Sequence, residues 1–160
     1  FMNWYVLYVK PQSEKKVASA LKRIGVTVFC PTITEVRVWS DRKKKLEVPL
    51  FKSYVFVNLS ESQRSRVFEV HGVVRYLFWL GKPAIVQDAE IETIKSWLAD
   101  EKLEDFEVKQ YRPGDDVTIA SGPLKDKKAV IHEIGAKTMR LVLKDLGVVV
   151  VASIRDVSKA

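Results

Sequence analysis

The stretch RPGDDVTIASGPLKDKKA, residues 112–129, decides the fold of the C-terminal part of this chain. Apolar and polar residues alternate over 117–120, which is the period-2 pattern of a half-buried strand, and a Pro-Gly and a Gly-Pro pair mark turns on either side of it. Several short strands with close turns predict a small β-barrel, and a module of about 48 residues is expected to bind a partner rather than catalyse. Three more β-type segments follow, at Ala129–Glu133, Met139–Leu143 and Val148–Val151.

The composition indicates a soluble globular chain of one domain or two small ones. Of its 160 residues, 47% are hydrophobic and 29% are charged. No apolar run approaches the roughly 18–20 residues of a membrane span, and the N-terminus lacks the layout of a secretory signal. The single cysteine, Cys30, fits a reducing compartment. We therefore expect a cytoplasmic protein without contact to a membrane. We also expect a monomer.

Charge is unevenly distributed along the chain. The net charge is +7, and residues 1–99 hold 16 Lys and Arg against 9 Asp and Glu. Such a basic excess favours a polyanionic partner, most simply nucleic acid. Residues 100–112 instead hold 3 basic against 5 acidic residues, and they are interpreted as a linker between domains at 1–99 and 113–160.

The first domain alternates predicted strands and helices. The order β-α-β-β-α-β-α predicts an antiparallel sheet with flanking helices, so the fold class is α+β. A helix capped by Ser13 and stopped at Gly25 follows the first strand, and Ser60 with Gln63 forms the capping box of a second helix. Two strands around a basic tip, Arg42–Lys45, predict a long hairpin. The predicted strands are Trp4–Val9, Thr32–Trp39, Leu50–Leu59 and Val73–Trp79, and a last helix begins at Asp88.

These segments, in this order, resemble the NusG family of transcription elongation factors. The resemblance is carried by Trp4–Val6 with Lys10, Pro49–Val57, Gly72–Leu77 with Pro83–Val86, and Gly114–Leu124, which is similar to the KOW motif of the family's C-terminal barrel. It implies an N-terminal domain of the NusG type, a linker and an SH3-like KOW barrel. Lys52-Ser53 stands where housekeeping members usually have Pro-Gly, and Ala129 where they have glycine. Both differences favour a specialised paralog of the RfaH or UpxY type.

The predicted strand Leu50–Leu59 has one mixed aromatic and polar face. Leu50, Tyr54 and Phe56 lie on this face, and Tyr8 continues it on the first strand. An aromatic-rich patch on a sheet is a credible protein-binding surface. The resemblance implies that its partner is the clamp-helix tip of the largest RNA polymerase subunit. The alternative is that one of the chain's own helices covers Tyr54 and Phe56.

A second set of residues is basic and is expected to meet DNA. Arginine suits bidentate contact with guanine or phosphate, and lysine acts as a point charge. The resemblance implies contact with flipped-out bases of the non-template strand near Lys10 and Arg23. The alternative is a solvated helix face, and the basic hairpin tip is either an electrostatic contact or a solubilising loop. The candidates are Lys10, Lys15, Lys22, Arg23 and Arg75.

A third set, Arg64, Ser65 and Arg66, begins the second helix. In the family this region faces the gate loop of the polymerase β subunit, which implies a contact there.

Catalysis has little support in this sequence. His71 and His132 fall in different modules, and no Cys and His spacing makes a zinc site. The pair Asp115-Asp116 follows Pro-Gly and indicates a plain turn rather than a metal site. No nucleophile elbow or phosphate-binding glycine loop is present, so we expect neither an enzyme nor a cofactor.

For the C-terminal barrel, the resemblance implies a small-subunit ribosomal protein or the termination factor Rho as partner. Some specialised relatives refold this module as a helical hairpin. Here Val148–Val151 is β-branched throughout, which favours strand. We therefore predict a barrel and no helical, autoinhibited state. The alternatives are a housekeeping NusG and a KOW-type RNA-binding protein of the ribosome or of translation.

Overall fold

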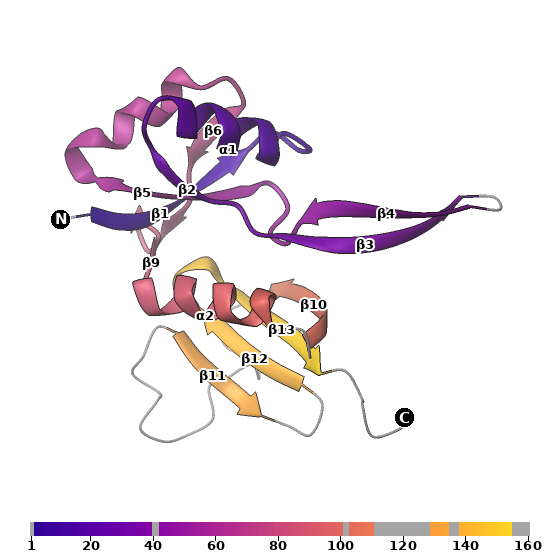
Figure 1. Ribbon diagram of the computed structural model, residues 1–160. Helices are drawn as coiled ribbons and strands as arrows, with labels where there is room; N and C mark the ends of the chain where they lie inside the picture. The colour runs from indigo at the N-terminus through magenta and orange to yellow at the C-terminus, as the bar shows by residue number, and fades with distance from the viewer. Residues whose placement is uncertain (1, 40–41, 101–102, 111–128, 135–137, 155–160) are drawn as a thin grey trace. The chain divides into compact units, whose positions relative to one another are not determined.

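A computed structural model describes residues 2–39, 42–100, 103–110, 129–134 and 138–154 (Figure 1). The chain divides into two compact units, residues 1–77 and 78–160, and each is described by itself. Within the described ranges, no helix is both long and apolar enough to cross a membrane.

The first unit is built on an antiparallel sheet with the strand order β2-β5-β1-β6. The first strand pairs with its neighbour β5 from Met2↔Ser60 to Tyr8↔Tyr54. Because cross-strand partners point to the same side, this register fixes the composition of each face. The elements are β1 (Met2–Val9), α1 (Glu14–Arg23), β2 (Thr27–Phe29), β3 (Thr32–Trp39), β4 (Arg42–Pro49), β5 (Tyr54–Ser60), the 3₁₀ helix η1 (Glu61–Glu69) and β6 (Val73–Tyr76).

Helices α1 and η1 lie on the same side of this sheet (Figure 1). Helix α1 buries Val17, Ala18 and Leu21, which recur at helical spacing. The two helices are joined by Arg66, whose guanidinium donates to the carbonyl of Ile24 at 2.5 Å. This face of the sheet is therefore closed by the unit's own helices.

Helix η1 is also tied to the sheet through Tyr76 of β6. The Tyr76 hydroxyl donates to the carbonyl of Arg64 at 2.6 Å, and the Arg64 guanidinium lies 5.6 Å from the ring centroid of Tyr5. Burial is the main cause that raises the pKa of Tyr76 to about 12, although the Arg64 charge opposes it. The tyrosine therefore stays protonated, as a donor to this carbonyl, at any ordinary pH.

Replacing Tyr76 with phenylalanine is expected to lower the free energy of unfolding by about 1 kcal/mol, because the Arg64 carbonyl loses its donor. The loss should be constant below pH 10, where the phenol is protonated in both folded and unfolded chains. Between pH 10 and 12 the unfolded chain releases a proton that the folded chain retains, so the wild type loses stability faster than the variant. Urea unfolding of both proteins across this range measures the difference, and a constant gap up to pH 12 would contradict it.

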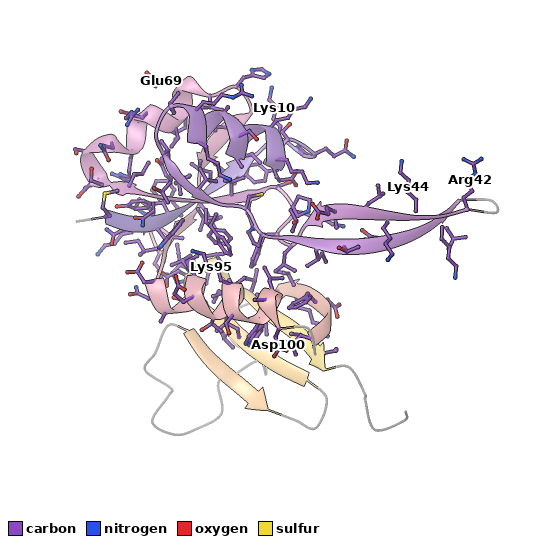
Figure 2. The ribbon with its side chains drawn as sticks, in the orientation of Figure 1. Lys10, Arg42, Lys44, Glu69, Lys95 and Asp100 are labelled. Carbon is purple, nitrogen blue, oxygen red and sulfur yellow. The ribbon has the colours of Figure 1, made fainter. Side chains whose placement is uncertain are left out.

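Strands β3 and β4 form a separate two-stranded ribbon in register from Thr32↔Pro49 to Trp39↔Arg42. It runs out from the sheet of its unit, and Figure 2 shows Arg42 and Lys44 on it. The predicted hairpin is confirmed, but Arg42–Lys45 belongs to a strand and not to a loop. The predicted strand Leu50–Leu59 is also corrected, because residues 50–53 form a turn and β5 begins at Tyr54.

The second unit contains an antiparallel sheet with the order β10-β13-β12-β11. Val148, Val149 and Val150 are all buried, so both faces of β13 are covered. Helix α2 begins with a capping box in which the backbone N–H of Gln87 donates to the Glu90 carboxylate at 2.9 Å. The elements are β7 (Phe78–Trp79), β8 (Lys82–Pro83), β9 (Ile85–Val86), α2 (Asp88–Ala99), β10 (Leu103–Gln110), β11 (Ala129–Ile134), β12 (Thr138–Leu143), the 3₁₀ helix η2 (Lys144–Leu146) and β13 (Val148–Ile154).

The α+β class and the three later C-terminal strands are confirmed, including strand rather than helix at Val148–Val151. The KOW strand predicted at 117–119 lies outside the described residues. The segment interpreted as a linker contains β10, which pairs with β13 from Leu103↔Ile154 to Gln110↔Val148. The division between units falls at 77/78 rather than near 100.

Candidate functional site

Three residues form a row across neighbouring strands of the first unit. Tyr8 of β1 is the register partner of Tyr54 on β5 and of Arg75 on β6. The two tyrosine rings meet edge to face, with centroids 6.2 Å apart and planes at 63°. The Arg75 guanidinium lies over the Tyr8 ring, 5.6 Å from its centroid. Both tyrosines are half-buried and Arg75 is exposed, so the row reaches the surface.

Tyr54 is positioned by the turn immediately before it. Ser53 has φ 68°, a left-handed conformation that favours glycine. Two hydrogen bonds hold it there: its amide donates to the buried Glu14 carboxylate at 2.8 Å, and its carbonyl accepts from the Val9 amide at 2.8 Å. The Glu14 carboxylate thus joins α1 to the turn.

Leu50 and Phe56 are core residues, and this corrects their predicted place on a docking surface. Leu50 is 6% exposed and Phe56 is 0% exposed. The Phe56 ring packs edge to face on Phe51, with centroids 5.0 Å apart, and against Phe29 at 5.8 Å. Of the four residues predicted to dock on a partner, only Tyr8 and Tyr54 have surface to offer.

The predicted DNA contacts lie at exposed positions. Lys10 follows β1, and Lys22 and Arg23 end α1, where they complement the negative end of the helix dipole. Lys15 is exposed but engaged, because its ammonium donates to the carbonyl of Glu47 at the base of the hairpin at 2.6 Å. Arg75 is also exposed, but it lies on β6 beside the tyrosines rather than with the basic candidates of α1.

The three residues predicted to meet the polymerase gate loop divide into two kinds. Arg64 and Arg66 are partly buried and hold η1 in place through the contacts with Tyr5 and Ile24. Ser65 between them is exposed. The arginines therefore have a structural role in the fold, and Ser65 offers the free surface of this segment.

Cys30 is the single cysteine of the chain, and its thiol is free and partly buried. Burial raises the pKa of its thiol, and the nearby Glu14 carboxylate acts in the same direction. Among the described residues, no cluster of three or more His, Cys, Asp or Glu could hold a metal ion. The raised pKa means that the Cys30 thiol is not activated.

The raised pKa gives a direct test of Cys30. At pH 7 its thiolate fraction lies below that of a free cysteine, and the thiolate is the reactive form. Iodoacetamide should therefore alkylate Cys30 more slowly in the folded chain than in the chain unfolded in urea. Between pH 8 and 10 the rate should rise by a larger factor in the folded chain than in urea. A folded-state rate equal to that in urea would contradict the burial.

Sequence reasoning placed Tyr8 and Tyr54 on one face of the sheet but did not place Arg75 beside them. The signal that could have placed it is the alternation of side chains along Val73–Tyr76. This alternation puts Arg75 and Tyr76 on opposite faces of the sheet. What the alternation cannot supply is the pairing of β6 with β1, and this pairing brings Arg75 to Tyr8.

Comparison with known proteins finds relatives that are similar in sequence over most of the chain. The family described as "Transcription termination factor nusG" matches residues 2–95. The curated protein "Transcription termination/antitermination protein NusG" of Pseudomonas aeruginosa is 26% identical over 87% of this chain and 85% of its own length. Its namesake in Escherichia coli strain K12 is 25% identical over 87% and 83%.

Among solved structures, "Domain interaction in Thermotoga maritima NusG" is 22% identical and aligns with a TM-score of 0.44 over 97% of this chain and 94% of the other. The family match alone spans more than half of the residues, and it includes every strand of the sheet that carries the tyrosine row. This chain belongs to the NusG family.

Proposed function

We propose that this chain is a transcription elongation and antitermination factor that docks on the clamp helices of RNA polymerase through Tyr8 and Tyr54. The observation that carries the proposal is the half-exposed tyrosine pair, held by β1, β5 and the Glu14–Ser53 turn. Tyrosine is common at interface hot spots because it offers a large, rigid surface with a polar tip. No chemical reaction is part of this proposal.

Docking would act by population shift. A factor that binds the closed, nucleic-acid-gripped clamp better than the open, paused one favours the closed state by the difference in binding free energy. Lys10, Lys22 and Arg23 are proposed to contact the non-template strand in the bubble, and Ser65 the gate loop of the β subunit. The basic ribbon around Arg42–Lys45 is proposed as a further electrostatic contact.

The C-terminal unit is proposed to capture a second partner, a ribosomal protein or Rho, in the cytoplasm where transcription takes place. Tethering would raise the effective concentration of that partner near the nascent RNA. Lys52-Ser53 and Ala129 favour action on selected operons rather than general elongation. A housekeeping role predicts equal activity on unrelated templates.

Transcription in vitro with purified polymerase tests the proposal. On a template with a strong pause, the wild-type chain is expected to shorten the pause, and a Tyr8→Ala/Tyr54→Ala variant to lose this effect. Phe78→Ala serves as the matched control, since Phe78 is another aromatic, 58% exposed, in the other unit. An unchanged pause with wild-type protein would sink the proposed function. Equal activity of the double variant would sink the docking face.

A further inference from the structure

We infer that Arg75 belongs to the polymerase-docking surface, where it pairs with a carboxylate on the clamp-helix partner, and not to the DNA-binding set. The inference rests on the proposed function and deepens it, because it gives the surface a charge requirement. It starts from the row Arg75–Tyr8–Tyr54, in which two strand pairings and two ring contacts converge on Tyr8.

The geometry prepares Arg75 for recognition of a planar acid. Its guanidinium rests over the face of Tyr8, which limits the side-chain freedom that binding would otherwise remove. Stacking leaves the fork of N–H donors around the rim of the guanidinium, and such a fork matches the two oxygens of a carboxylate. Arginine is also, with tyrosine and tryptophan, the residue type enriched at interface hot spots.

The same geometry argues against a nucleobase at this position. Single-stranded nucleic acid binds through open aromatic faces on which successive bases stack. Here the guanidinium covers a face of Tyr8, and the Tyr54 ring stands at 63° to it rather than parallel. The row thus presents ring edges, hydroxyls and a cation, which suits a protein surface better than a base.

The charges around the row also favour an acidic partner. Lys10 at the end of β1 and Lys52, two residues before Tyr54, are both exposed, whereas the Glu14 carboxylate on Ser53 is buried. The exposed charges that adjoin the row in sequence are therefore positive. Among the residues that the structure describes, no ion pair engages Arg75. Arg75 therefore brings an uncompensated charge to the docking surface, and complementarity calls for an acidic residue on the partner.

The test measures binding to RNA polymerase and binding to DNA separately, so that it shows which of the two depends on Arg75. The full-length chain and its variants are titrated against core RNA polymerase free of nucleic acid, and separately against a single-stranded DNA oligonucleotide. The variants are Arg75→Ala, Arg75→Lys, Tyr54→Ala and, as the matched loss of one exposed arginine, Arg23→Ala. Thermal unfolding of each variant checks that the fold is retained.

We expect Arg75→Ala to weaken polymerase binding about 10-fold or more, the loss typical of a charge-assisted hydrogen bond. Arg75→Lys should restore only part of it, because lysine lacks the planar fork. Affinity for the oligonucleotide should fall clearly less in Arg75→Ala than in Arg23→Ala, because Arg23 belongs to the proposed DNA-binding set. Loss of DNA binding alone, or wild-type polymerase affinity in Arg75→Ala while Tyr54→Ala is impaired, would overturn the inference. Wild-type affinity in both variants would overturn the docking face itself and this inference with it.

Discussion

A Phe56→Ala variant is expected to lose about 3–5 kcal/mol of unfolding free energy, the usual cost of emptying a buried aromatic site. Phe56 is completely buried, and its ring packs between Phe51 and Phe29 in the centre of β5. Losing it would open a cavity and remove two ring contacts at once. Urea unfolding followed by tryptophan fluorescence measures the change.

Tyr54→Ala is the matched control for Phe56→Ala, since Tyr54 lies two residues earlier on the same face of the same strand but is only half-buried. Its loss should cost less than about 1.5 kcal/mol. Equal destabilisation by the two variants would contradict the assignment of Phe56 to the core. The comparison also matters for function, because a Phe56 variant that fails to bind polymerase has first of all failed to fold stably.

Gly72→Ala is expected to destabilise the first unit by about 2–4 kcal/mol. Gly72 has φ 105°, which L side chains rarely adopt, and a Cβ here would come within 2.9 Å of Val17 Cγ2. Val17 is fully buried in α1 and cannot move aside cheaply. The Gly72 carbonyl also accepts from the Lys10 amide at 2.9 Å, so a shift of this turn would disturb the end of β1.

Gly25 supplies a close control for this variant, because it also has a positive φ, 89°, but open space around the position of a Cβ. Gly25→Ala should therefore cost only the backbone strain, about 1–2 kcal/mol. Chemical denaturation of both variants separates strain from steric overlap. A Gly72→Ala variant no less stable than Gly25→Ala would show that α1 does not press on this turn.

The alternating pattern predicted much of the fold because it reflects the two faces of a strand. It predicted β1, β3, β11, β12 and β13 from local sequence, and the capping residues predicted where η1 begins. It failed for Leu50 and Phe56 because burial depends on side chains distant in sequence. Phe29, from β2, covers Phe56 only after β2 pairs with β5, and no local pattern encodes that pairing.

Charge misled the prediction at the hairpin. Four consecutive cations, Arg42–Lys45, suggested a loop, because isolated charged runs are usually solvated. In the structure they continue β4, since the ladder with β3 is completed by backbone hydrogen bonds and does not depend on apolar side chains. A ribbon that is exposed on both faces can carry such a sequence.

Only part of the row formed by Tyr8, Tyr54 and Arg75 could be predicted from the sequence. Strand alternation put the two tyrosines on one face, but Arg75 was grouped with the α1 cations by charge. Strand order, which places β6 beside β1, was needed to move it to the tyrosine row.

Tyr8 and Tyr54 are proposed to form the surface that binds RNA polymerase. Equilibrium binding of nucleic-acid-free core polymerase to the wild-type chain, to Tyr8→Ala/Tyr54→Ala and to the Phe78→Ala control tests it most directly. We predict that the double variant binds about 30-fold more weakly or worse, as expected when interface hot spots are removed, and that the control binds like the wild type. Equal affinity of all three proteins, with folding verified, would contradict the account.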